Sequence, residues 1–131
     1  MFKTVLFPVD ESRESRDCVE VVVNVVQKYG SRLLLLSVVE TTEGQEASTE
    51  LLHKVNAFLN KAKATLAEHD IAAETLLREG KPAFVICDVA DELNVDLIIM
   101  GSRGLGLTDE AEDSVSTRVI NLSPCPVLVV P

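Results

Sequence analysis

The fold of this chain is decided by the stretch Ile98-Ile99-Met100-Gly101-Ser102-Arg103-Gly104-Leu105-Gly106, in which an apolar strand runs into a cluster of glycines. Glycine has no Cβ, so its backbone can approach a bound anion closely and can adopt positive φ values. A helix after such a turn presents free N–H groups and the positive end of its dipole to that anion. The pattern predicts a phosphate-facing loop after a buried strand. Four carboxylates stand in the same loop, at Asp109, Glu110, Glu112 and Asp113.

Strand-like and helix-like patterns alternate along the whole chain. Apolar runs predict strands at residues 3–9, 33–39, 73–78, 96–100 and 127–130. Apolar residues at helical spacing predict helices at residues 12–29, 48–69, 82–93 and 114–122. The alternation predicts an α/β fold, in which one domain, residues 1–131, holds a doubly wound, five-stranded parallel sheet. A ligand of such a sheet binds beyond the carboxyl ends of the strands, where the strand order reverses.

The composition bounds the class of protein. With 131 residues, of which 47% are hydrophobic and 4% aromatic, the chain is long enough for one domain with a mainly aliphatic core. The count of 12 basic against 21 acidic residues gives a net charge of −9, which disfavours nucleic acid and anionic membranes as partners. No signal peptide and no apolar stretch of membrane-spanning length is visible, so we expect a cytoplasmic protein.

Common enzyme signatures are missing from the sequence. The cysteines Cys18, Cys87 and Cys125 lie far apart and lack metal-ligand spacing. There is no Ser-His-Asp order, no HExxH motif and no Walker lysine. The first strand leads into Pro8-Val9-Asp10-Glu11-Ser12 rather than GxGxxG, which disfavours a hydride-transfer enzyme. We therefore expect a binding module rather than a catalyst.

Five segments resemble the universal stress protein family in their order and spacing. They are Phe7-Pro8-Val9-Asp10 with Ser12, then residues 36–40, 80–90, 96–104 and 114–130. The resemblance covers essentially the whole chain. It implies a Rossmann-like sheet, similar to that of the adenine nucleotide alpha hydrolases, with the strand order 3-2-1-4-5.

Nucleotide-binding members of this family carry the motif Gly-x2-Gly-x9-Gly-(Ser/Thr), and this chain matches its first half. Gly101 and Gly104 occupy the first two glycine positions. If Ser114 is the hydroxyl residue, Asp113 stands where the family has its third glycine and the spacing is one residue short. The alternative alignment keeps the spacing but places Ser114 at the glycine and Val115 at the hydroxyl, which fits less well. The resemblance therefore implies a nucleotide site whose second half is degenerate.

The resemblance also implies roles for individual residues. Pro8, Val9 and Asp10 would frame the base and the ribose, and the Asp10 carboxylate would lie near the ribose or a metal ion. Val38 and Met100 would pack on the adenine. The remaining implied nucleotide-binding residues follow the fourth strand or begin the last helix: Gly101, Arg103, Gly104, Ser114, Val115 and Ser116.

The resemblance and the motif together predict an adenine-nucleotide-binding (AMP, ADP or ATP) regulatory protein of the stress response. Two alternatives stay open, namely an interaction module that binds no nucleotide, suggested by Asp113, and a slow ATP hydrolase. Hydrolysis would need a metal such as Mg²⁺ on the acidic loop, for which Asp10 and Asp113 are weak candidates. Consecutive acids do not define a metal site, and a solvated acidic loop is the preferred interpretation.

The last strand, Val127-Leu128-Val129-Val130, predicts self-association. It is apolar on both alternating faces and would form an edge of the sheet. A bare apolar edge exposes unpaired N–H and C=O groups to another strand. Two-fold pairing of equivalent strands is the simplest closed arrangement, and the family resemblance implies it as well. We expect a homodimer, and whether two dimers form a tetramer stays open.

Overall fold

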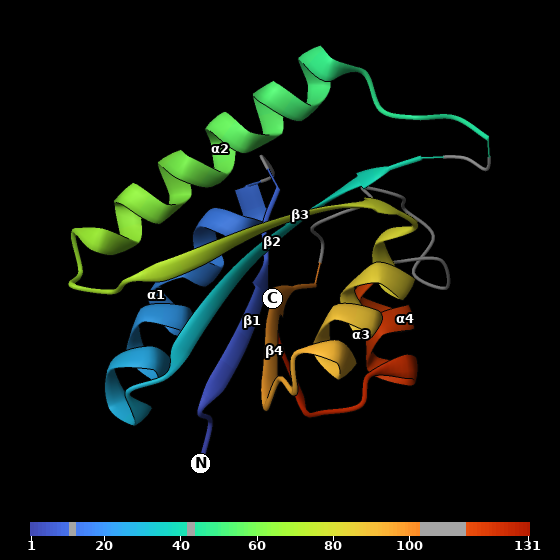
Figure 1. The fold of residues 1–131 in the computed structure, drawn as a ribbon. Coiled ribbons are helices and arrows are strands. Elements are labelled where there is room, and N and C mark those ends of the chain that lie inside the picture. Colours follow the sequence, from blue (N-terminus) through green and yellow to red (C-terminus); the bar gives the residue numbers. More distant parts are fainter. Residues whose placement is uncertain (11–12, 42–43, 103–114) are drawn as a thin grey trace.

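Strands and helices alternate in the predicted order in a computed structural model of the chain, which describes residues 1–10, 13–41, 44–102 and 115–131 (Figure 1). The strands are β1 (Thr4–Pro8), β2 (Arg32–Glu40), β3 (Ala73–Gly80), β4 (Leu97–Gly101) and β5 (Val127–Val130). The helices are α1 (Arg13–Tyr29), α2 (Thr49–Ala67), α3 (Pro82–Glu92) and α4 (Val115–Leu122). Their ends lie within about two residues of the expected ones.

The strands form one parallel sheet in the order β3-β2-β1-β4-β5, which confirms the predicted fold class and strand order. β1 lies in the middle, where Val5 pairs with Leu33 of β2 and with Leu97 of β4. After β3 the chain crosses to the other side of β1, so the strand order reverses between β1 and β4. This reversal places the expected ligand site at the carboxyl ends of β1 and β4.

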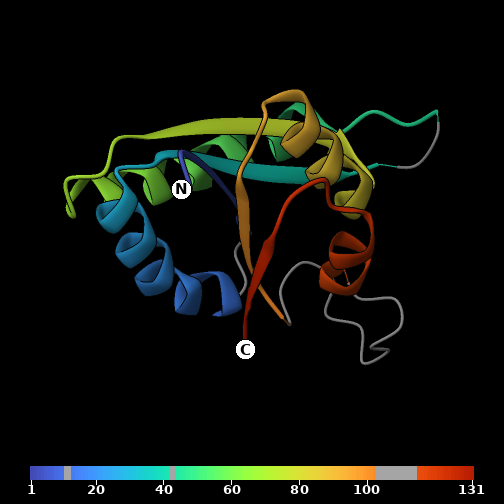
Figure 2. The same ribbon diagram turned by 90° about the horizontal axis from the view of Figure 1, so that it is seen from below.

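Each face of the sheet carries its own hydrophobic core. Val5 and Phe7 of β1 pack under α1 and α2, whereas Leu6 packs under α3 and α4. The same alternation continues along β2, where Leu33 and Leu35 join the first core. Because both faces are buried, the central strands carry runs of consecutive apolar residues, such as residues 33–36 of β2, rather than an apolar residue at every second position. Figure 2 shows α1 and α4 on opposite sides of the sheet.

Local signals explain where the helices begin and where the chain turns. The Ser48 side chain accepts a hydrogen bond from the Leu51 N–H and so caps α2. Pro82 occupies the first turn of α3, where the missing N–H has no helical partner to lose. Gly80 has φ = 141°, and a Cβ there would lie 2.8 Å from Val85 Cγ2, so glycine is required between β3 and α3. None of the described helices is long and apolar enough to cross a membrane.

Candidate functional site

The carboxyl end of β1 is held by two backbone contacts to β2. The Val9 N–H donates to the Leu36 carbonyl oxygen at 2.8 Å, and the Ser37 hydroxyl donates to the Val9 carbonyl oxygen at 2.8 Å. Ser37 is 4% exposed, so its hydroxyl satisfies a carbonyl that water reaches poorly. These contacts fix the backbone immediately before Asp10, whose side chain is partly exposed. Ser37 was not among the predicted site residues, although a lone hydroxyl inside an apolar strand was a signal for it.

The carboxyl end of β4 lies beside that of β1 and is anchored to β5 and α4. Gly101 pairs with Val130, and the Ser102 N–H donates to the Val130 carbonyl oxygen at 2.9 Å. The Ser116 hydroxyl, from the first turn of α4, donates to the Ser102 carbonyl oxygen at 3.2 Å. Ser116, predicted as a nucleotide-binding residue, therefore links the first turn of α4 to the residue that follows β4.

The other predicted residues lie on both faces of the sheet. Pro8 and Val9 are buried, and Val9 belongs to the core under α1 and α2. Met100 is 2% exposed and, with the partly buried Val38 and Val115, belongs to the core under α3 and α4. Asp10 directly follows β1 and Gly101 is the last residue of the neighbouring strand β4, so both lie at the carboxyl end of the sheet. Several predicted residues lie outside the described part of the chain: Arg103, Gly104, Asp109, Glu110, Glu112, Asp113 and Ser114.

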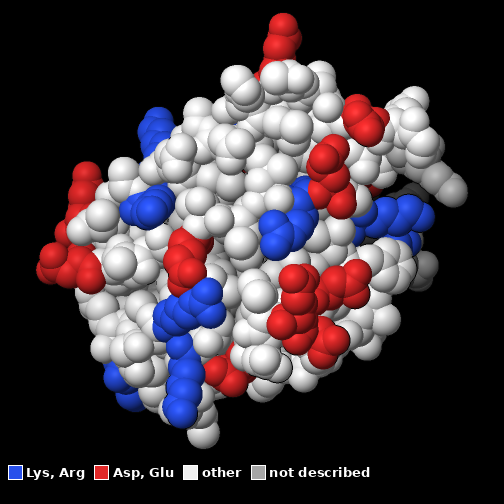
Figure 3. All heavy atoms as spheres, viewed as in Figure 1, with Lys and Arg blue, Asp and Glu red and all other residues white. Residues whose placement is uncertain are grey.

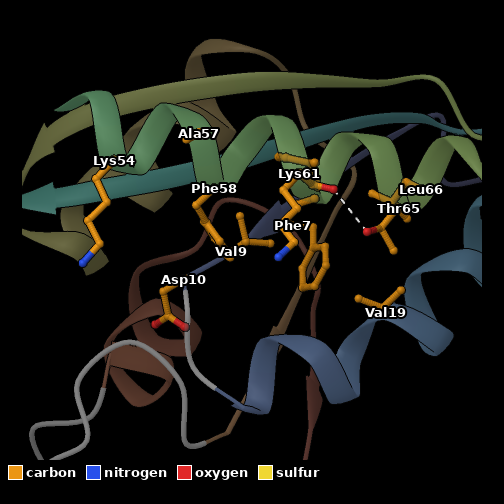
Figure 4. Close-up of a pocket in the computed structure, with 12 residues that line it drawn as sticks. Phe7, Val9, Asp10, Val19, Lys54, Ala57, Phe58, Lys61, Thr65 and Leu66 are labelled. Carbon is orange, nitrogen blue, oxygen red and sulfur yellow. Dashed lines mark hydrogen bonds between the residues drawn. The ribbon is translucent and has the colours of Figure 1, made fainter. Parts of the chain in front are cut away.

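A cavity of about 830 Å³ opens between α1 and α2, next to the carboxyl end of β1 (Figure 4). Its floor comes from β1 and β2, through Phe7, Val9 and Leu35. α2 supplies one wall, and Val19 of α1 lies on the opposite side. Asp10 also lines this cavity, so the cavity adjoins the edge where β1 and β4 end. The size is within the range of small-molecule sites, which is about 300–1,000 Å³.

The described residues do not assemble a metal site or a reactive thiol. Among them, no group of three or more His, Cys, Asp or Glu side chains is close enough to hold a metal ion. Burial raises the pKa of both the Cys87 and the Cys125 thiol, so the nucleophilic thiolate is disfavoured at neutral pH. Cys18 is fully buried in the core under α1 and α2. Cys18 and Cys87 therefore act as packing residues, whereas Cys125 is only partly buried.

The surface shown in Figure 3 carries acidic and basic side chains interspersed with each other. Arg32 Nε and Glu74 Oε2 form an exposed ion pair at 2.5 Å, and the Arg32 guanidinium lowers the pKa of the Glu74 carboxyl. Binding along a nucleic-acid backbone requires a continuous basic track. This face does not offer one, in agreement with the net charge of −9.

Together, the fold and the residues at the carboxyl ends of β1 and β4 define a class of protein. A doubly wound parallel sheet presents a carboxylate, Asp10, and a glycine, Gly101, at the point where the strand order reverses. In this class, ligands bind at that edge.

Comparison with known proteins assigns the family. The universal stress protein family matches residues 1–131, and the chain belongs to that family. It is 53% identical over 136 residues to the universal stress protein Sll1654 of Synechocystis, covering 100% of this chain and 87% of the relative. A solved universal stress protein in complex with cAMP has the same fold, with a TM-score of 0.83 and 21% identity over 99% of this chain and 97% of that one. A universal stress protein of Archaeoglobus fulgidus in complex with dAMP gives a TM-score of 0.81 and 20% identity over 99% and 98%.

Proposed function

We propose that this chain is an adenine-nucleotide-binding regulatory protein that works as a homodimer and binds its nucleotide at the carboxyl ends of β1 and β4. The observation that carries the proposal is the position of Asp10 and Gly101. Asp10 follows β1 and Gly101 ends the adjacent strand β4 at the reversal point. The Ser37 hydroxyl holds the Val9 carbonyl next to Asp10, and Gly101 pairs with Val130. A carboxylate there can accept hydrogen bonds from the two ribose hydroxyls. A glycine there lets the ribose and the first phosphate approach the backbone.

The ligands of structural relatives support the choice of an adenine nucleotide. Two universal stress proteins with this fold are solved with cAMP and with dAMP, which share an adenosine-type core and a single phosphate. The part of the motif retained here, Gly101 and Gly104, is the part expected to face the ribose and the first phosphate. Asp113 stands where the glycine for the outer phosphates is expected. We therefore propose AMP or ADP as the preferred ligand.

The position of β5 supports the homodimer. The strand order leaves β5 at one edge of the sheet, paired with β4 alone among the described strands. Its four residues are all apolar, and the Leu128 side chain is 38% exposed. A second copy of β5 would satisfy the open backbone groups and cover these side chains.

Calorimetric titration with AMP, ADP and ATP, each with and without Mg²⁺, tests the nucleotide proposal. We expect AMP to bind and Asp10→Asn to weaken it at least fivefold, because an amide replaces a charged acceptor of the ribose hydroxyls. The matched control is Asp91→Asn, which removes the same charge from an exposed position near the end of α3. Binding that is unaffected by Asp10→Asn would place the nucleotide elsewhere.

The same titration decides between the proposal and its alternatives. The first alternative, suggested by Asp113 in place of the third motif glycine, is a protein-interaction module that binds no nucleotide. This alternative requires that no adenine nucleotide binds at millimolar concentration. Slow hydrolysis requires that ATP with Mg²⁺ is converted to ADP during the titration, which chromatography of the mixture detects. Binding of AMP without conversion of ATP is the result that the proposed function requires.

A further inference from the structure

The cavity between α1 and α2 has a chemical character that the nucleotide proposal does not use. Most of the twelve described residues that line it are apolar, among them Phe7, Val19, Phe58 and Leu66. The polar side chains among these described residues are Asp10, Lys54, Lys61 and Thr65. The Thr65 hydroxyl already donates to the Lys61 carbonyl oxygen at 3.1 Å. An apolar floor with few polar groups is suited to an apolar ligand body rather than to the hydrogen-bonding edge of a base.

Two lysines give this cavity a positive rim. Lys54 and Lys61 are seven residues apart on α2, so they share one face of the helix about 10 Å apart. Figure 4 shows both side chains extending from α2 toward the cavity. No ion pair to either ammonium group occurs among the described residues, in a chain whose net charge is −9. A negative group entering the cavity would therefore meet two ammonium groups that form no ion pair with any described residue, with Asp10 as the described carboxylate that lines the same cavity.

We propose that this cavity binds an aliphatic monocarboxylate, with its chain on Phe7, Val19 and Phe58 and its carboxylate at Lys61 and Lys54. The apolar floor contributes through the area that the ligand removes from water. The two ammonium groups attract the carboxylate of the ligand. This attraction is stronger where the bound ligand covers part of the rim and displaces water from it. Asp10 lies at the same cavity and disfavours a second negative charge, so a single carboxylate is the matching head group.

A simpler role for the lysines is that their aliphatic stems cover apolar surface while their ammonium groups stay in water. That role requires no preference for a negative ligand. The two explanations differ in what happens when the ligand keeps its chain but loses its charge, and when the lysine loses its charge but keeps its length.

The test is calorimetric titration of the full chain with octanoate and with 1-octanol, which has a chain of the same length and no charge. We expect octanoate to bind at least fivefold more tightly than 1-octanol. Lys61→Gln should remove most of the preference for octanoate over 1-octanol. The double variant Lys54→Gln with Lys61→Gln should remove the rest. Lys63→Gln is the matched control, because Lys63 is an exposed lysine of the same helix that does not line the cavity.

Methyl chemical shifts locate the bound octanoate independently of affinity. We expect shifts at Val9, Val19 and Leu66, and none at Leu36 or Val119, which belong to the opposite core. Equal affinities for octanoate and 1-octanol, no binding at millimolar octanoate, or shifts confined to the opposite core would each overturn the proposal. The proposal would also be overturned if AMP displaced octanoate and if Lys61→Gln weakened AMP binding as much as octanoate binding. The cavity would then be part of the nucleotide site. Octanoate binding does not test the nucleotide proposal, which is tested separately by the titration with AMP, ADP and ATP.

Discussion

Replacing Ser37 by alanine tests whether this residue only stabilises the protein or also positions the candidate site for AMP binding. In the structure the buried Ser37 hydroxyl donates to the Val9 carbonyl oxygen at 2.8 Å, one residue before Asp10. Removing the hydroxyl leaves that carbonyl without this donor, and an unsatisfied buried acceptor costs about 1–3 kcal/mol. For a domain of this size, 1 kcal/mol lowers Tm by roughly 3–5 °C. We therefore expect Ser37→Ala to lower Tm by roughly 3–15 °C.

The same substitution should also weaken nucleotide binding, because the backbone that carries Asp10 loses one of its two anchors. We expect the affinity for AMP to fall about threefold to tenfold, measured by calorimetry well below the Tm of the variant. Ser48→Ala is the control, since it removes the cap of α2 and costs about 1 kcal/mol at a residue that neither lines the cavity nor belongs to the predicted nucleotide site. Its Tm should fall while its affinity for AMP stays the same.

Two outcomes would refute this reasoning. A Tm within about 1 °C of the wild type would show that water or a shifted backbone replaces the lost hydroxyl. A lowered Tm with unchanged AMP affinity would show that Ser37 stabilises the sheet without positioning Asp10.

Three further predictions concern the acidic loop, the edge strand and the thiols. Metal-free ATP should bind no more tightly than AMP, and Asp113→Gly should improve ATP affinity tenfold or more, because a carboxylate about 5 Å from a phosphate costs roughly 3 kcal/mol at a dielectric constant near 20. Calorimetry that finds metal-free ATP tenfold tighter than AMP in the wild type would contradict this. Leu128→Lys or Val129→Pro should convert a dimer to a monomer in sedimentation, and a wild-type chain that is monomeric at tens of micromolar would remove β5 as the interface. Burial raises the pKa of the Cys87 thiol, so its labelling by a disulfide reagent should be slow at pH 8, accelerate as the pH rises toward the raised pKa, and become fast in urea.

Much of the fold was predictable from the sequence, for a physical reason. The unbroken apolar runs at residues 33–36 and 97–100 require burial on both faces, and strands of that kind occur in parallel sheets covered by helices. Local sequence signals indicate where helices begin, such as Ser48 before α2 and Pro82 at the start of α3. Element type and element order rest on interactions between residues close together in the chain. Family resemblance supplied the strand order, which local patterns do not encode.

The tertiary structure decided which residues share a space. Val9 directly follows β1 and Met100 is the last residue but one of β4, yet their side chains belong to different cores. A single ligand can therefore reach both only at the carboxyl ends of these strands. The contact between Ser37 and Val9 joins residues 28 positions apart. The cavity lined by Phe7, Lys54 and Lys61 exists because α1 and α2 cover different strands and leave a space between them. Periodicity identifies the buried face of each helix, but the gap between two helices depends on how both pack on the sheet, and no single stretch of sequence contains that information.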